Sequence, residues 1–271
     1  MNYYSKDQIK SILKENFEFI KFSLKNHIIT ITLNRAHKRN AIHPQTLNEL
    51  AFVLQYIFYE KNIRVILIES SGSVFCSGAD LDAMMGNAAK HNSSIPNSKK
   101  EILLGQILTE VHKPIISKVE GSVYAGGYIY LACSTYVIAC DHLEFSLPEV
   151  KRGIFPMQVM GLLMRVMIPR NIIDWCIRGY SLSAQKAKKW GLISKVVPQN
   201  KIDQEVQSWV KNILENSPKA ISLGLEAFEK LIDQEKNQKY LAKMLDKVLE
   251  SDDAKEGITA FKEKRKPSWK K

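Results

Sequence analysis

The sequence predicts an α/β fold, in which strands and helices alternate through a core and further helices follow. Apolar runs at residues 65–68 and 115–119 are short and continuous, which is typical of strands buried on both faces of a sheet. Before them, the apolar residues of 44–59 recur at helical spacing. Residues 202–213 place apolar side chains on one helical face, and strand-like runs do not follow. Strands that alternate with helices favour a β/α core.

The expected division is a β/α core over residues 1–200 and a C-terminal helical segment over residues 201–271. Within the core, residues 1–16 are predicted to form a short polar helix or arm. Residues 17–22 and 27–33 are alternating or β-branched, which predicts a hairpin whose turn contains Lys25-Asn26.

The remaining elements are predicted from local patterns of the same kind. Ser183 and Asp80 precede helical stretches and are predicted N-caps. Residues 86–98 are rich in Asn, Ser and Lys, and we expect a mobile surface loop there. Further helices are predicted at 102–111, 128–133, 159–167 and 171–177, and further strands at 136–139 and 195–197.

Composition excludes several classes of protein. No apolar run reaches the roughly 18 residues that a membrane-spanning helix needs. The first fifteen residues are polar and mixed in charge, so we expect a cytoplasmic protein and no membrane partner. The four cysteines lack paired spacing, which predicts reduced core thiols and argues against a zinc site or disulfides: Cys76, Cys133, Cys140 and Cys176.

The net charge of +11 leaves three kinds of partner open: a nucleic acid, a membrane surface or a polyphosphorylated small molecule. The Lys and Arg residues are spread along the chain, apart from a cluster at 262–271. Zinc-finger spacing, aromatic RNA-binding motifs and heptad-linked basic regions are absent from the sequence. A nucleic-acid partner is therefore not expected.

Two turns rich in small residues each precede a predicted helix. One is Ala125-Gly126-Gly127, after the strand at 115–119, and the other is Ser77-Gly78-Ala79. The first N–H groups of a helix have no internal acceptor and lie at its positive end, so they can hold an oxygen that becomes negative during a reaction. Glycines that simply allow two backbones to touch are the alternative.

These residues, taken in order, resemble the crotonase superfamily, the enoyl-CoA hydratase/isomerase family. The resemblance covers nearly the whole chain from residue 16 and rests on several ordered motifs rather than any single one. The motifs are Leu33-Asn34-Arg35 with Asn40-Ala41, Phe75 to Leu81, Lys113-Pro114 through Glu120-Gly121 to Gly126-Gly127, Leu147-Pro148-Glu149 with Gly153 and Pro156, Gly179 with Ser183-Ala184, Ala187 and Trp190-Gly191-Leu192, and Ala260 to Pro267.

The resemblance implies a crotonase-like β/α superhelical core, a C-terminal helical trimerisation segment, and a homotrimer or hexamer. It implies a coenzyme A thioester as substrate, with no further cofactor and no metal. The backbone N–H groups of Ala79 and Gly126 match the family's oxyanion hole. Other positions that match substrate-binding segments are Arg35, Lys38, Ala41, Ser77, Asp80, Leu81, Gly127, Ile129, Tyr130, Phe261 and Lys264. Among these, the basic residues are the candidates for binding the coenzyme A phosphates.

One catalytic carboxylate of the family is missing. Glu149 matches the second of the two glutamates that hydratases use, whereas Ile129 occupies the place of the first. A single carboxylate suits the transfer of one proton between two carbons, so the resemblance favours double-bond isomerisation. An apolar neighbour such as Ile129 should raise the pKa of Glu149. The alternative is an exposed loop carboxylate paired with Lys151 or Arg152.

Three other functions stay open at this point. The first is hydration of a 2-enoyl-CoA, because the whole motif set resembles hydratases as much as isomerases. The second is decarboxylation or carbon–carbon cleavage of an acyl-CoA, or of an acyl group on an acidic acyl carrier protein. The third is a non-catalytic binding protein on the same fold, since fold alone does not fix function.

Overall fold

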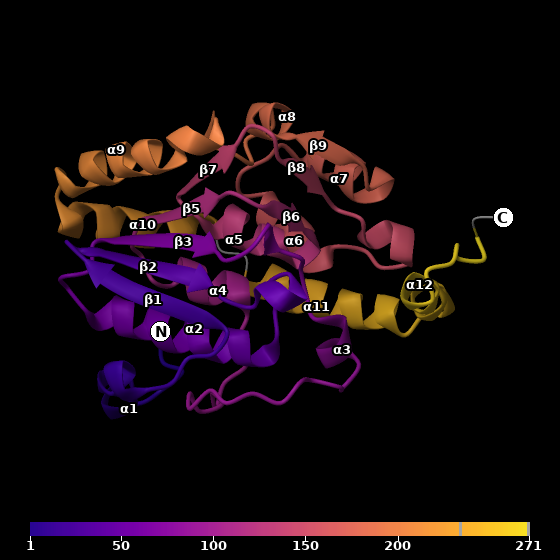
Figure 1. Cartoon of the computed structure of the whole chain (residues 1–271), viewed down its shortest axis with the longest axis horizontal. Coiled ribbons are helices and arrows are strands. Elements are labelled where there is room, and N and C mark those ends of the chain that lie inside the picture. Colours follow the sequence, from indigo (N-terminus) through magenta and orange to yellow (C-terminus); the bar gives the residue numbers. More distant parts are fainter. Residues whose placement is uncertain (233–234, 270–271) are drawn as a thin grey trace.

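Two β-sheets organise the residues that the structure, a computed structural model, describes, which are 1–232 and 235–269 (Figure 1). The sheets contain mostly parallel strand pairs, and helices pack around them. The fold is therefore α/β, as predicted. No helix in these residues is long and apolar enough to cross a bilayer.

The larger sheet has the strand order β1-β2-β3-β5-β7-β10. Its strands are β1 (Ile20–Lys25), β2 (Ile28–Leu33), β3 (Val65–Ser70), β5 (Ile115–Val119), β7 (Tyr136–Cys140) and β10 (Lys195–Val197). β1 and β2 form the predicted antiparallel hairpin. Its turn is at Asn26 and His27, both with positive φ, one residue later than predicted. The other neighbouring pairs are parallel.

The smaller sheet has the order β4-β6-β8-β9 and consists of three-residue strands. They are β4 (Val74–Cys76), β6 (Ser122–Tyr124), β8 (Glu144–Ser146) and β9 (Ser181–Ser183). β4, β6 and β8 are parallel, with Cys76 paired to Val123 and Tyr124 paired to Ser146. The carboxyl ends of these three strands therefore lie at one edge of the sheet.

Helices connect and cover the strands (Figure 1). In the first two hundred residues they are α1 (Lys6–Lys10), α2 (Pro44–Tyr59), α3 (Leu81–Met84), α4 (Leu104–Thr109), α5 (Tyr128–Cys133), α6 (Met157–Leu163), α7 (Pro169–Arg178) and α8 (Ala184–Lys189). Short 3-10 turns are η1 (Ile12–Lys14), η2 (Ala36–Lys38), η3 (Ala125–Gly127), η4 (Glu149–Arg152) and η5 (Gln199–Lys201). The predicted caps are confirmed: Ser183 accepts from the N–H of Lys186, and Asp80 from those of Asp82 and Ala83.

Four helices complete the described chain: α9 (Ile202–Leu214), α10 (Pro218–Ile232), α11 (Glu235–Leu249) and α12 (Asp252–Lys262). α9 packs on the larger sheet, with Trp209 edge-on to Tyr136 at 4.9 Å and Asp203 paired to Lys118 at 2.7 Å. The predicted division at residue 200 therefore falls between the larger sheet and α9, the helix that packs on it. α10 exposes apolar side chains such as Leu223 and Phe228, and the expected trimer remains a prediction.

The N-terminal arm is more buried than its polar composition predicts. Tyr3, Tyr4 and Ile9 are buried, and the side-chain oxygen of Gln55 accepts hydrogen bonds from the N–H groups of Tyr3 and Tyr4 at 2.7 and 3.0 Å. The arm therefore packs on α2 rather than extending into solvent.

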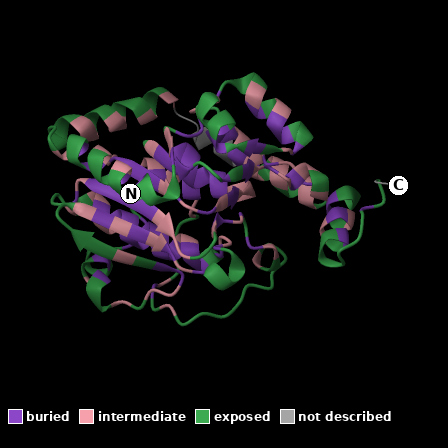
Figure 2. Cartoon of the chain, turned by 45° about the horizontal axis from the view of Figure 1, so that its top comes forward, coloured by how far each residue is buried: buried purple, intermediate pink, exposed green. Residues whose placement is uncertain are grey.

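Residues 86–98 form an irregular segment, as predicted, but side-chain amides fasten it to α2. Gln45 donates to the carbonyl of Ile95 at 3.0 Å, and Asn48 donates to the side-chain oxygen of Asn97 at 2.9 Å. The buried residues concentrate in the strands of the sheets and in the helices that pack on them (Figure 2). All four cysteines are buried free thiols, as the sequence predicts.

Candidate active site

The three predicted catalytic residues lie in turns that follow the three parallel strands of the smaller sheet. Ala79 follows β4, Gly126 follows β6 and Glu149 follows β8. Ligands of α/β proteins commonly bind beyond the carboxyl ends of parallel strands. The topology therefore directs the three residues toward a common region, although they are far apart in the sequence.

The turns of Ala79 and Gly126 are in direct contact. A Cβ atom placed on Gly78 would lie 2.9 Å from the amide nitrogen of Gly126, and one placed on Gly126 would lie 3.5 Å from the amide nitrogen of Ala79. Neither amide donates to an acceptor within the part of the chain that the structure describes. Two adjacent backbone N–H groups without acceptors are the components of an oxyanion hole.

A short backbone bridge fixes the turn that contains Ala79. The N–H of Ile42 donates to the carbonyl of Gly78 at 2.8 Å, and the N–H of Asp80 donates to the carbonyl of Ile42 at 3.1 Å. The carbonyl of Gly78 and the N–H of Asp80, on either side of Ala79, are thereby hydrogen-bonded to Ile42, whereas the N–H of Ala79 is not. No sequence pattern singles out Ile42, since the bridge forms only when distant segments of the chain meet in space.

Glu149 is a buried carboxyl group at the start of η4. It is 9% exposed, and its Oε2 atom has no hydrogen-bond partner among the described residues. Burial raises the pKa of Glu149 to about 7, while its own backbone N–H and the charge of Arg152 act in the opposite direction. The alternative of an exposed carboxylate in a surface ion pair is therefore wrong. A group with this pKa can both accept and donate a proton near neutral pH.

The titratable neighbours of Glu149 on α5 and α7 are uncharged, because burial raises the pKa of each. Tyr128 of α5 is fully buried, donates its hydroxyl to the carbonyl of Val123 at 2.7 Å, and packs on Trp175 with ring centres 5.0 Å apart. Burial raises the pKa of Cys176 to about 12, and the charge of Glu149 adds to this shift. Both groups are therefore neutral at physiological pH.

Ile129 is buried on α5. Its place beside the reacting carbons stays a prediction. Within residues 1–232 and 235–269, no second carboxyl group influences the pKa of Glu149. A catalytic site with a single acid–base carboxylate stays a prediction.

Arg35 and Asp80 form a buried ion pair rather than a surface for phosphates. Their side chains are 2.6 Å apart, and Arg35 is only 3% exposed. Burial alone would raise the pKa of Asp80, but the hydrogen bonds from Arg35 and from the first amides of α3 lower it. Asp80 therefore engages the guanidinium, and a contact of Arg35 with coenzyme A stays a prediction. Its guanidinium holds the turn before α3 and stacks on Phe19.

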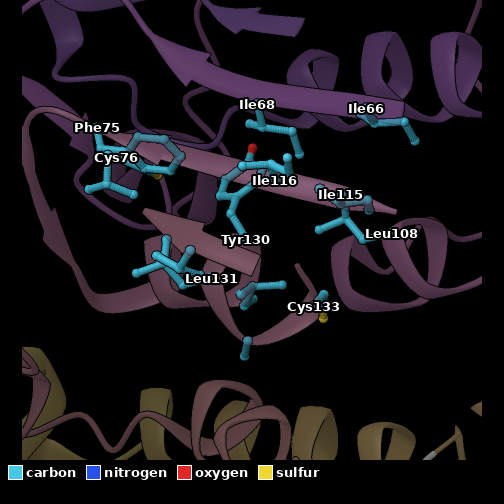
Figure 3. Packing of buried hydrophobic residues seen from close by; sticks show 14 of the residues in the cluster. Ile66, Ile68, Phe75, Cys76, Leu108, Ile115, Ile116, Tyr130, Leu131 and Cys133 are labelled. Atoms are coloured by element: carbon cyan, nitrogen blue, oxygen red, sulfur yellow. The ribbon is translucent and has the colours of Figure 1, made fainter. Parts of the chain in front are cut away.

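Two other predicted contacts are packing residues. A Cβ atom on Gly127 would lie 2.8 Å from the carbonyl oxygen of Cys76, so this glycine lets α5 approach β4. Tyr130 is 1% exposed and points toward Ile68 and Ile116 in the core (Figure 3).

The remaining predicted residues surround the turns at various depths. Ala41, Ser77 and Leu81 are half-buried near the Ala79 turn, whereas Lys38 and Lys264 are exposed and free to meet an anionic ligand. Phe261 of α12 is 50% exposed, and its ring lies under the Arg152 guanidinium. From its sequence position, Arg152 was expected only as an ion-pair partner of Glu149.

A cavity of about 400 Å³ lies elsewhere, between the start of α2 and residues 88–91. His43, Asn48 and Lys90 are among its lining residues, whereas Ala79, Gly126 and Glu149 are not. Since the cavity contains none of the three predicted catalytic residues, it is distinct from the candidate active site.

Backbone donors after β4 and β6, together with a buried carboxyl group after the parallel strand β8, are the groups needed for chemistry in which an oxygen becomes negative and a proton moves. Comparison with known proteins identifies the family. The model of the enoyl-CoA hydratase/isomerase family matches residues 23–271. The chain therefore belongs to this family of acyl-CoA enzymes, as the sequence motifs predict.

Individual relatives span almost the same length. The chain is 29% identical over 252 residues to mevalonyl-coenzyme A hydratase sidH of Aspergillus fumigatus, covering 90% of this chain and 92% of the relative. It is 30% identical over 247 residues to enoyl-CoA hydratase domain-containing protein 3, mitochondrial, of Rattus norvegicus, covering 89% and 81%. It is 29% identical over 264 residues to carnitinyl-CoA dehydratase of Escherichia coli O157:H7, covering 93% and 98%.

Solved structures show the same fold. Carnitinyl-CoA hydratase from Mycobacterium avium superposes with a TM-score of 0.80 at 26% identity, covering 94% of this chain and 99% of that one. Methylmalonyl CoA decarboxylase superposes with a TM-score of 0.78 at 24% identity, covering 93% and 98%. The second comparison supports the crotonase fold alone.

Proposed function

We propose that the protein is an enoyl-CoA isomerase, which moves a double bond along an acyl-CoA by transferring one proton through Glu149. The principal observation is the buried carboxyl group of Glu149, with one oxygen unpaired and Ile129 in place of a second carboxyl. The deprotonated carboxylate would remove a proton from one carbon and return it to another. The amides of Ala79 and Gly126 would stabilise the thioester oxygen of the intermediate enolate.

An apolar residue at position 129 also disfavours the competing reaction. Hydration requires a water molecule to be held, activated and added to one carbon while a proton reaches the next. Ile129 offers no hydrogen bond to such a water. Isomerisation needs only the proton and the oxyanion hole, which the described residues supply.

Hydration or dehydration is the second candidate. It is supported by the relatives, which are named mevalonyl-coenzyme A hydratase and carnitinyl-CoA dehydratase. In that case Glu149 alone would handle both the water and the proton. The exposed residues Lys38 and Lys264 would meet the coenzyme A phosphates in either reaction, as strongly charged ligands favour basic surfaces.

The experiment compares 3-enoyl-CoA and 2-enoyl-CoA as substrates of the purified protein, and measures double-bond migration and water addition separately. Glu149→Gln keeps the size of the side chain but removes its basicity, and Glu144→Gln, at an exposed position of β8, is the matched control. We expect isomerisation to exceed hydration and to fall about 100-fold or more in Glu149→Gln only. Hydration that exceeds isomerisation and survives this change would overturn the proposal.

A further inference from the structure

Arg152 and Glu149 share the 3-10 turn η4, yet their charged groups are not paired. The central guanidinium carbon of Arg152 lies 4.0 Å from the centre of the Phe261 ring, over its face. Meanwhile Oε2 of Glu149 is buried without any hydrogen-bond partner in the described part of the chain. The cation therefore contacts an aromatic ring while an unpaired carboxylate oxygen lies on the same turn.

The helix that supplies Phe261 is fixed against η4 by direct backbone contact. A side chain at position 153 would collide with the carbonyl of Asp253, and one at position 257 would collide with the carbonyl of Arg152. Lys262 also pairs with Asp82 of α3, at 3.4 Å. α12 therefore touches both the turn of Glu149 and the helix that follows Ala79, and the position of Phe261 is set by these contacts.

We propose that Phe261 is a positioning residue, whose ring holds the Arg152 guanidinium away from Glu149 and thereby keeps this carboxyl group free of an ion pair. This inference rests on the proposed function, in which Glu149 transfers the proton. A cation over an aromatic face is attracted by the ring quadrupole, most strongly where water is partly excluded. Arg152 is half-buried, so this condition is met.

The other groups around Glu149 do not substitute for Arg152. On α5 and α7 the nearest titratable groups, Tyr128 and Cys176, are neutral because burial raises the pKa of each. On η4 itself Lys151 is exposed, and on α12 the side chain of Asp253 is exposed. Among the described residues, Arg152 is the one whose charge influences the pKa of Glu149.

The proposal predicts a direction of change. An opposite charge in contact lowers the pKa of a carboxyl group by about one to three units. Removing the ring frees Arg152 to approach Glu149, so its pKa should fall. Removing the Arg152 charge as well should abolish this fall in pKa, because no cation is then left on η4 to contact Glu149.

The test measures the protonation of Glu149 directly, without substrate. The infrared band of the protonated carboxyl group is followed against pH in the full-length protein, and Glu149→Gln identifies the band. Phe261→Leu keeps an apolar side chain without a ring, and Phe261→Tyr restores the ring. Phe228→Leu is the matched control, because it also removes an aromatic ring next to an arginine. The central guanidinium carbon of Arg165 lies 5.9 Å from the centre of the Phe228 ring.

We expect the titration midpoint to fall by about one pH unit in Phe261→Leu, and to stay at the wild-type value in Phe261→Tyr and Phe228→Leu. In the Arg152→Gln background, Phe261→Leu should cause no shift. The ascending limb of kcat/KM against pH should move with the band. An unchanged midpoint in Phe261→Leu, or the same shift with and without Arg152, overturns the proposal. If the band shifts as expected but activity does not depend on Glu149, the proposed function fails while the positioning role stands.

Discussion

The methyl group of Ala125 occupies the space that a side chain on Gly78 would need, since it lies 2.7 Å from the point where a Cβ atom of residue 78 would be. Gly78 has φ +91° and Ala125 has φ +49°, so both turns use left-handed backbone at their point of contact. The two turns that present the amides of Ala79 and Gly126 can therefore approach each other only while residue 78 is glycine.

Gly78→Ala should disable the oxyanion hole. The added methyl group would press on Ala125 and on the Gly126 amide, so at least one N–H would move from its position. Loss of one such donor lowers kcat by about 100-fold to 1,000-fold, and steady-state kinetics would measure it. Gly86→Ala is the control, because Gly86 has a similar φ of +81° but no atom within 4 Å of the new methyl. Equal losses in both variants would show that backbone strain, not the contact, is responsible.

Glu149→Gln should stabilise the folded protein at alkaline pH. The pKa of the carboxyl is raised to about 7 when folded, whereas it is near 4.5 in the exposed chain. Between these values only the folded state retains the proton, so wild-type stability falls as pH rises through this window and then levels off. The difference corresponds to about 3 kcal/mol. Urea unfolding at pH 8 should show the variant to be more stable, and the gain should vanish at pH 4. A gain of equal size at both pH values would contradict the prediction.

Breaking the buried pair of Arg35 and Asp80 should reduce stability rather than substrate affinity alone. Arg35→Leu would leave the Asp80 carboxylate buried without its partner, which costs about 3–5 kcal/mol. Lys38→Ala removes an exposed charge nearby and should change KM for the acyl-CoA with little effect on unfolding. Denaturant unfolding and substrate saturation curves of both variants would check the contrast. A stable Arg35→Leu protein with only a raised KM would support the interpretation that Arg35 binds phosphate.

Ile129→Glu should shift the balance of reactions toward water addition. The new carboxylate would lie beside the reacting carbons, where it could hold a water molecule opposite Glu149. We expect the ratio of hydration to isomerisation to rise about tenfold or more, measured on the two enoyl-CoA isomers. Ile129→Gln has a similar shape but no basicity, and should leave the ratio close to wild type. An equal rise in both variants would assign the effect to polarity or space.

The helices that follow a clear start signal were predictable from sequence. The bounds of α2, Pro44–Tyr59, and of α5, Tyr128–Cys133, are those predicted, since apolar side chains follow a flanking Pro or Gly in both. The three-residue strands of the smaller sheet were not predicted. A pattern that alternates every second residue cannot be recognised in segments as short as Val74–Cys76 or Ser122–Tyr124.

The candidate site was predictable where the chemistry is local to one turn. Ala79, Gly126 and Glu149 stand out because small residues or a motif surround each of them. The ion pair of Arg35 was not predicted because its partner Asp80 comes from a distant segment, and a basic residue in a loop cannot reveal a buried carboxylate. The contact of Arg152 with Phe261 was equally hidden, since it forms only after α12 docks on η4.

The backbone contact between Gly153 and α12 also has a consequence for synthesis in the cell. A ribosome releases η4 long before it releases α12, because proteins are made from the N-terminus onward. Until then the turn of Glu149 packs on α7 but lacks its contact with α12. A nascent chain stalled before α12 would therefore have its strands while the turn of Glu149 is incompletely packed, and we expect activity to begin only after α12 has been made.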